Sequence, residues 1–401
     1  MIQEVQKEHT LLVKGPSRVK LLEGKIEVFG KTFLPEKSEQ KSTIIVPSAN
    51  NYPFFALEPS KLEIFTNNKN NMQIIEENTI NKEWIRIKDT VISALRKNED
   101  KKPLKLMVLG LSGGKTTLIK YLANNIIKEG FSVSFLDSDL GQQLLYLPTT
   151  LNVGEVKESI VSSADIESEE TIFIGSTFPK GNFKFIVSHS CKNLIKNYHS
   201  THKDTDIVLI DSDGWIKTEA GIIYKNFFID TIDPDILIVF HDDGIEELDE
   251  IEKNASKSKK RKILLLKEQN NYFYEKDKEE RRFMRQSQFA KVLENYRKIS
   301  IPLNEIKFIK AGYDAEEDKI TEIEIDINNL ITLPYHYVIV ALLTEDSKFI
   351  RIGLLFVINI EKNYILLFSD LNFKEQNKIK KILLGSLRLS IKGNHQGYLY
   401  L

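Results

Sequence analysis

The sequence has almost no cysteine: Cys191 is the only one among 401 residues. A disulfide within the chain is therefore excluded, and so is the class of small secreted domains that depend on such bridges. Sparse cysteine use of this kind is typical of a reducing compartment.

Long apolar runs are also lacking. A stretch such as Tyr335 to Leu343 is too short to span a bilayer. The first ten residues, MIQEVQKEHT, lack the apolar core of a secretory signal. We therefore expect a protein without a membrane partner that resides in the cytosol, or in the nucleus if its source has one.

The chain has almost no net charge, because its 56 basic residues nearly balance its 57 acidic residues. The distribution is uneven, however. Residues 253–298 contain 15 Lys or Arg against 6 Asp or Glu. A local excess of this kind suits a polyanion, which could be a triphosphate, a nucleic acid or both.

The feature around which the chain is organised is a glycine-rich turn at 110–114. An apolar run, Leu106 to Leu109, precedes it, and a segment with the helical spacing of Leu118, Leu122 and Ile126 follows. This order predicts a strand, a phosphate loop and a helix. Glycine backbone N–H groups, a helix N-terminus, a lysine ammonium and a threonine hydroxyl can together hold a nucleoside triphosphate and Mg²⁺. The residues expected to contact ATP are Gly110, Ser112, Gly113, Gly114, Lys115, Thr116 and Thr117.

The glycine spacing departs from the usual phosphate loop. Three residues separate Gly110 from Gly114 where the pattern has four, and Leu109 occupies the position of the first glycine. The loop predicts nucleotide binding. Whether the nucleotide is consumed stays open at this point.

Two aspartate-rich segments follow apolar runs. Asp137 and Asp139, with Gln142 close behind, come after the run at 131–136, and Asp211 ends the run at 207–210. A carboxylate at the end of a strand beside a triphosphate can hold Mg²⁺ or take a proton from an attacking hydroxyl. The residues leave Asp139 and Asp211 as competing candidates for the magnesium-associated carboxylate.

Two further segments have both a simple and a functional interpretation. Trp215 could stack on a base or lie in the core. Arg281 and Arg285 lie one helical turn apart on a charged stretch that is either a solvated face or a lid over phosphates.

The elements predict an α/β protein. A central phosphate-loop domain at 79–300, with a doubly wound parallel sheet, is expected between a small N-terminal β domain at 1–78 and a small C-terminal β-containing domain at 301–401. Within the first of these, the asparagine-rich stretch 66–78 is expected to be a linker. Ligands of doubly wound sheets bind at the carboxyl ends of the strands, where the acidic segments should converge.

Taken together, these motifs resemble the polynucleotide 5'-hydroxyl kinase family, whose members include RNA kinases associated with tRNA splicing, mRNA 3'-end cleavage and pre-rRNA processing. GGKTTL is similar to the family's phosphate loop, and DSDLGQ is similar to its Asp-x-Asp-x-Gly-Gln motif. GSTFPKGN resembles its substrate clasp, DGWI its Gly-Trp segment, and RRFMR its arginine lid. The N-terminal VKGPSRVKLLEGKIEVFG is similar to its β domain.

The resemblance implies transfer of the ATP γ-phosphoryl group to the 5'-hydroxyl of RNA, or of DNA, and a possible place in an RNA-processing nuclease complex. It implies that Lys115 holds phosphates, that Thr116 and Asp139 hold Mg²⁺, and that Asp139 also orients or deprotonates the hydroxyl. Arg281 or Arg285 would close over the phosphates. Substrate contacts would come from Asp137, Gln142, Thr177, Pro179, Asn182 and Trp215.

Two alternatives remain open on the sequence alone. The shortened loop would suit a scaffold that binds ATP in an RNA-processing complex and transfers nothing. Asp211 at a strand end would suit an NTPase switch.

Overall fold

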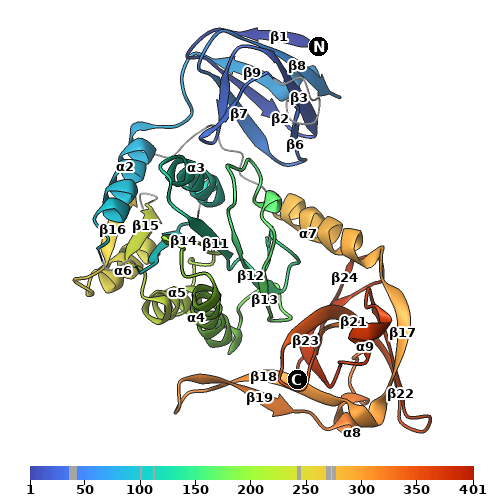
Figure 1. Cartoon of the computed structure of the whole chain (residues 1–401). Coiled ribbons are helices and arrows are strands. Elements are labelled where there is room, and N and C mark those ends of the chain that lie inside the picture. Colours follow the sequence, from blue (N-terminus) through green and yellow to red (C-terminus); the bar gives the residue numbers. More distant parts are fainter. Residues whose placement is uncertain (36–42, 100–101, 112, 242–244, 268–271, 273–276) are drawn as a thin grey trace.

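The computed structural model describes residues 1–35, 43–99, 102–111, 113–241, 245–267, 272 and 277–401. Its elements form three groups that follow one another along the chain. Figure 1 shows N-terminal strands at one end, a layered α/β part in the middle, and a C-terminal group of strands reached through helix α7 (Lys278–Leu293).

The N-terminal group consists of two facing sheets, as expected for a small β domain. Their strand orders are β1-β8-β3-β6 and β5-β4-β7-β2-β9. Alternate residues of β3, such as Val19 and Leu21, are buried, so the two sheets enclose an apolar core. The strands are β1 (Ile2–Val5), β2 (Thr10–Lys14), β3 (Ser17–Glu23), β4 (Ile26–Val28), β5 (Lys31–Phe33), β6 (Thr43–Val46), β7 (Asn51–Ala56), β8 (Ser60–Thr66) and β9 (Met72–Ile75).

The stretch 66–78 is more than the expected linker. It contains a turn of 3₁₀ helix, η1 (Lys69–Asn71), and then β9, which pairs antiparallel with β2. The asparagines belong to the turn, where the Asn68 side chain accepts a hydrogen bond from the Asn70 N–H. β9 forms because β2 offers it a free edge, which composition alone does not reveal.

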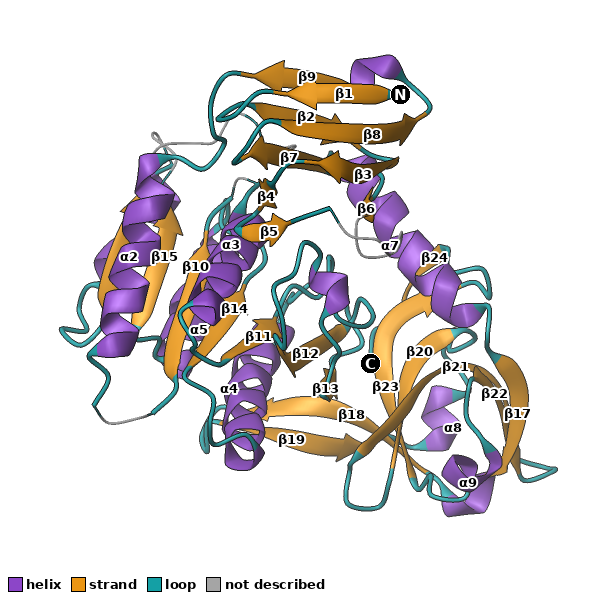
Figure 2. Cartoon of the chain, turned by 45° about the horizontal axis from the view of Figure 1, so that its top comes forward, coloured by secondary structure: helices purple, strands orange, loops and turns teal. Residues whose placement is uncertain are grey.

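The central group confirms the doubly wound α/β fold. Strands β11, β14, β10, β15 and β16 are parallel neighbours in that order. Helices α2 and α3 cover one face, while α4, α5 and α6 cover the other. Figure 2 shows α2, α3, α4 and α5 around the strands of this sheet. The bounds are α2 (Lys82–Arg96), β10 (Leu104–Leu109), α3 (Lys115–Lys128), β11 (Val133–Asp137), α4 (Phe183–Thr201), β14 (Ile207–Asp211), α5 (Glu219–Ile232), β15 (Ile236–Phe240), α6 (Glu246–Ala255) and β16 (Lys262–Leu266).

One edge of this sheet departs from the purely parallel arrangement. Strands β12 (Thr150–Glu155) and β13 (Glu170–Phe173) extend it antiparallel beyond β11, with the short η2 (Ser163–Asp165) between them. β12 is inconspicuous in sequence because it contains Asn152 and Gly154. Its buried Asn152 is hydrogen-bonded to Thr150, Ser168 and Thr171.

The C-terminal group is a sheet in the order β17-β22-β21-β20-β23-β18-β19, and β24 pairs with β23. β17 straddles the boundary expected at residue 300 and pairs with β22. The bounds are β17 (Arg297–Pro302), η3 (Leu303–Glu305), β18 (Lys307–Asp314), β19 (Lys319–Glu324), α8 (Ile327–Leu330), β20 (Val338–Leu343), β21 (Phe349–Asn359), β22 (Tyr364–Ser369), α9 (Phe373–Gln376), β23 (Lys381–Leu389) and β24 (His395–Tyr398).

Close contacts join the three groups, and two of them lie next to the elements of the central group that carry predicted site residues. Asn124 on α3 donates to the carbonyl oxygen of Phe29 at 2.7 Å, which ties the N-terminal group to the helix after the phosphate loop. The carbonyl oxygen of Gly175 accepts bonds from the N–H groups of Ser386 and Leu387, which ties the C-terminal sheet to the central one. Among the helices of the described residues, none combines the length and apolar character needed to cross a membrane.

Candidate active site

The phosphate loop lies between the end of β10 and the start of α3, as the sequence predicts. Gly110 (φ +154°) and Gly114 (φ +109°) both adopt positive φ. A Cβ atom on Gly110 would lie 2.5 Å from Cβ of Phe240 on β15, so this position needs glycine for both conformation and space. Ser112 lies outside the described residues.

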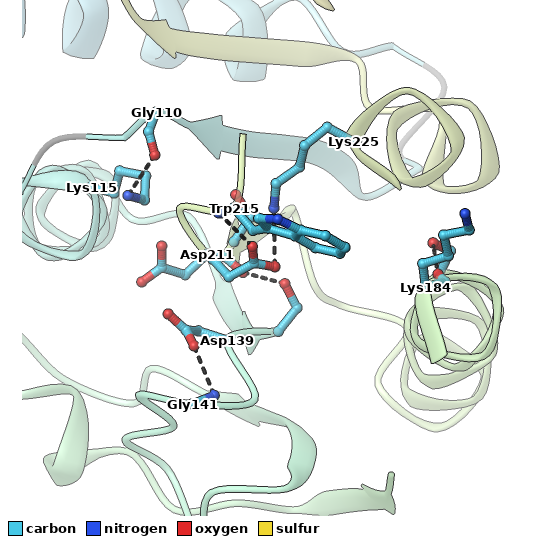
Figure 3. A network of polar contacts seen from close by, with 12 residues as sticks. Gly110, Lys115, Asp139, Gly141, Lys184, Asp211, Trp215 and Lys225 are labelled. Carbon is cyan, nitrogen blue, oxygen red and sulfur yellow. Dashed lines mark hydrogen bonds and ion pairs between the residues drawn. The ribbon is translucent and has the colours of Figure 1, made fainter. Parts of the chain in front are cut away.

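Lys115 and Thr116 start α3 with their side chains turned toward the neighbouring strand ends. The Lys115 ammonium donates to the Gly110 carbonyl oxygen at 2.8 Å (Figure 3). Burial lowers the pKa of Lys115, whereas the nearby Asp211 and Asp139 carboxylates oppose that shift. The Thr116 hydroxyl donates to Oδ2 of Asp211 at 2.5 Å.

Asp211 ends β14 and is almost fully buried. Within the described part of the chain, its Oδ1 atom has no hydrogen-bond partner. Burial raises the pKa of Asp211 to about 6, against the hydrogen bond from Thr116 and the charge of Lys115, which both favour the ionised form. A buried carboxylate oxygen without a donor is costly unless a cation or proton satisfies it. This oxygen and the Thr116 hydroxyl are hard ligands of the kind that Mg²⁺ prefers.

Asp139 is held by the turn that follows β11. Its Oδ1 atom accepts the backbone N–H groups of Gly141 and Gln142, each at 2.9 Å. Figure 3 shows Asp139 and Asp211 on the same side of the site, near Lys115. Burial and the charge of Asp213 raise the pKa of Asp139, which suits a group that takes up a proton.

Asp137 differs from Asp139 in its surroundings. Its Oδ1 atom accepts the N–H of Asp139 and its Oδ2 atom accepts the N–H of Leu144. Both oxygens are therefore engaged in shaping the turn. The Gln142 amide donates to the carbonyl oxygens of Gly141 and Arg281, so this side chain links the turn to α7.

A cavity of about 350 Å³ brings these groups together. The predicted residues that line it are Gly113, Gly114, Lys115, Thr116, Thr117, Asp139, Gln142, Asp211 and Arg281. The N-terminal group closes one side with Phe29, Asn50 and Tyr52. The cavity therefore lies between two groups of elements, with the phosphate loop at its base.

The loop after β13 carries the remaining predicted substrate contacts. Thr177 lies beside the Asp139 turn: a Cβ atom on Gly141 would lie 3.1 Å from the Thr177 carbonyl oxygen. Pro179 is buried, and the exposed Asn182 directly precedes α4. The ring of Phe178 packs on that of half-buried Trp215, with 4.4 Å between their centres.

Two arginines of helix α7, Arg281 and Arg285, lie in different surroundings. The helix begins with a capping box in which Asp277 and Glu280 satisfy each other's backbone N–H groups. Arg281 lines the cavity at the phosphate loop. Arg285 lies near Gly141, where burial lowers its pKa and the Asp139 charge opposes that shift.

Comparison with known proteins shows what the chain is similar to. Residues 112–295 match the family model described as the mRNA cleavage and polyadenylation factor CLP1 P-loop. A polyribonucleotide 5'-hydroxyl-kinase of Methanocaldococcus jannaschii is 25% identical over 339 residues, which are 75% of this chain and 91% of that protein. One of Pyrococcus horikoshii is 30% identical over 219 residues, which are 54% of this chain and 57% of that protein. The chain is thus similar to polynucleotide 5'-hydroxyl kinases and, over residues 112–295, to the CLP1 P-loop.

The fold is also similar to that of a solved structure. A solved structure of Clp1p in complex with a segment of Pcf11p superposes with a TM-score of 0.68 and covers 97% of both chains, at 13% identity. The three groups of elements therefore share their arrangement with Clp1p.

Several residues around the phosphate loop could not be predicted from the sequence. Phe29, in the turn between β4 and β5, and Tyr52, on β7, line the cavity, but both come from a β region with no local sign of a site. Lys225 on α5 is fully buried and pairs with Asp213 at 3.0 Å, just behind Trp215. A lysine within the otherwise apolar stretch of α5 was the one local signal for that pair.

Proposed function

We propose that this chain is an ATP-dependent polynucleotide 5'-hydroxyl kinase that transfers the γ-phosphoryl group to the 5'-hydroxyl end of RNA, or of DNA. One observation carries the proposal: Lys115, Thr116, Asp139 and Arg281 line a single cavity. These are a phosphate-binding cation, a metal-binding hydroxyl, a carboxylate of raised pKa and a second cation. Phosphoryl transfer requires mainly such positioning and charge neutralisation.

The phosphates would lie on the N-terminus of α3, with Lys115 against the outer ones. The Thr116 hydroxyl and the carboxylates of Asp139 and Asp211 form the donor set for Mg²⁺, which fits the unpartnered buried Oδ1 atom of Asp211 among the described residues. Bound there, Mg²⁺ would neutralise charge on the phosphate oxygens. Arg281 would approach the same phosphates from α7.

The acceptor end would lie between Asp139 and the loop with Thr177, Pro179 and Asn182. The Asp139 carboxylate would orient the 5'-hydroxyl and take its proton, because two backbone N–H groups fix its direction. Asp137 would hold the turn and Gln142 would support it from beside Arg281. Trp215, packed on Phe178, would offer its remaining exposed surface to a base.

One experiment separates this function from the alternatives. The protein is incubated with γ-labelled ATP, Mg²⁺ and an oligonucleotide that bears a 5'-hydroxyl, with Lys115→Ala and Asp139→Ala as controls. Labelled oligonucleotide that depends on both residues supports the kinase. Bound but unconsumed ATP would instead support a scaffold, and free phosphate without labelled oligonucleotide an NTPase switch.

The RNA-processing setting is part of the proposal. Its support is the similarity of residues 112–295 to the CLP1 P-loop of an mRNA cleavage and polyadenylation factor. Co-purification with a nuclease of RNA processing, and 5' labelling of its cleavage products, would test this setting.

A further inference from the structure

A second cavity, of about 270 Å³, lies on the other side of α7, against the C-terminal group. Helix α7 contributes Arg282, Arg285 and Gln286 to it, and β24 contributes His395 and Tyr398. Thr177 reaches it from the loop after β13. The full lining, all of it described, contains no Asp or Glu, so the cavity is cationic.

The two arginines are not ion-paired within the described residues, and the carboxylate that acts on Arg285, Asp139, lies outside the cavity lining. Among the described residues, neither Arg282 nor Arg285 forms an ion pair, whereas other arginines such as Arg261 and Arg351 do. Both arginines line the cavity together with His395, and burial, Arg282 and Arg285 lower the pKa of that imidazole. Two guanidinium groups that line one cavity with no carboxylate in its lining can bind an anion.

This cavity lies near the place proposed for the reacting end. A Cβ atom on Gly141 would lie 3.1 Å from the Thr177 carbonyl oxygen, 3.5 Å from Oδ1 of Asp139 and 3.6 Å from an Arg285 nitrogen. Gly141 therefore lies next to Asp139 and also next to Thr177 and Arg285, two residues that line the cationic cavity. The Thr177 hydroxyl also lies 3.4 Å from the Tyr398 hydroxyl, so two polar groups meet in the cavity lining.

We propose that this cavity, between α7 and β24, binds the first internucleotide phosphate of the nucleic acid, with Arg282 and His395 as substrate-positioning residues. The inference rests on the proposed function, which places the 5' end of the nucleic acid at Asp139 and so sets the direction of the nucleic-acid chain. The C-terminal group then takes part in substrate recognition: it supplies His395 and Tyr398 to the site, and α7 supplies the charge. A polynucleotide end is thereby preferred over a free nucleoside.

The test compares Arg282→Gln with Lys291→Gln, which removes the same charge from an exposed position of the same helix outside the cavity lining. Binding of a fluorescent oligonucleotide with a 5'-hydroxyl is measured by anisotropy without ATP. Loss of a charge-assisted contact should weaken binding about tenfold in Arg282→Gln. Lys291→Gln should bind as the wild type does. In the transfer assay, Arg282→Gln should raise KM for the oligonucleotide and leave kcat and KM for ATP unchanged.

A modified substrate assigns the effect to the phosphate. An oligonucleotide whose first linkage is an uncharged methylphosphonate should bind the wild type as weakly as the unmodified oligonucleotide binds Arg282→Gln. Its affinity should not fall further when the protein is Arg282→Gln. His395→Gln should give a smaller change of the same kind. Equal weakening by Arg282→Gln and Lys291→Gln would overturn the assignment, and so would additive effects of variant and methylphosphonate. If the wild type transfers no phosphate, the binding arms still decide about the cavity, and the kinase proposal fails separately.

Discussion

Asp139 combines a fixed direction with a raised pKa, and this combination leads to the first prediction. Asp139→Ala should lower the rate of transfer by a few orders of magnitude, because both a proton acceptor and a metal contact are lost. ATP binding should be kept, since Lys115 and the loop are untouched, whereas Lys115→Ala should abolish transfer. Single-turnover labelling and equilibrium ATP binding measure the two effects. A near-normal rate in Asp139→Ala would move the catalytic carboxylate to Asp137 or Asp211.

Asp211 should make the stability of the nucleotide-free protein depend on pH. Its pKa, raised by burial from 3.8 to about 6, means that the folded state binds this proton more tightly than the unfolded chain does. The associated stabilisation is complete below about pH 4 and is lost as the pH rises through about 6. Asp211→Asn should therefore be more stable than the wild type at pH 7.5, by up to about 3 kcal/mol.

Thermal unfolding at several pH values checks this prediction. The difference between Asp211→Asn and the wild type should vanish below about pH 4 and shrink when Mg²⁺ is added at pH 7.5. A difference that stays the same at every pH would show that the ionisation of Asp211 is not its source.

At the scale of elements, the phosphate loop depends on Gly110. In Gly110→Ala, the positive φ becomes strained and the new methyl group meets Phe240 at 2.5 Å. We expect the affinity for ATP to fall about tenfold or more, since such strain typically costs 1–3 kcal/mol. Gly130→Ala is a matched control, because Gly130 also has positive φ but nothing within 4 Å. Calorimetric titration with ATP should separate the two variants, and equal affinities would contradict the role given to Gly110.

The elements also show which parts of the fold and of the site could be predicted from the sequence. The loop from β10 into α3 could be predicted because its glycines, lysine and apolar flanks are all local signals. β9 was mistaken for a linker because its formation depends on the edge of β2, far away in the chain. The same holds for Phe29, Tyr52 and His395, which only the packing of distant groups brings to the two cavities. The division at 1–78, 79–300 and 301–401 stays a prediction, as do the roles of the site residues.

At the scale of the whole molecule, the C-terminal sheet meets the central sheet at two glycines. A Cβ atom on Gly385 would lie 2.7 Å from the Cα atom of Gly175 and 2.8 Å from its carbonyl oxygen. That same oxygen accepts the N–H groups of Ser386 and Leu387 at 2.8 and 3.1 Å. The contact fixes the loop with Thr177 relative to β23, and hence the distance between Asp139 and the cavity at His395.

Gly385→Ala should therefore impair binding of the nucleic acid more than binding of ATP. The added methyl group must push β23 away from Gly175, which weakens the backbone contacts and shifts His395 and Tyr398 relative to Thr177. We expect KM for the oligonucleotide to rise about tenfold, since overpacking typically costs 1–3 kcal/mol. The affinity for ATP should be unchanged, because neither Gly175 nor Gly385 lines the cavity at the phosphate loop. Ser386→Ala, which removes only a 3.2 Å hydroxyl contact to Gly175, is the control and should behave as the wild type. If Gly385→Ala weakened the binding of ATP and of the oligonucleotide equally, the contact between Gly175 and Gly385 would stabilise the whole fold and not the nucleic-acid site alone.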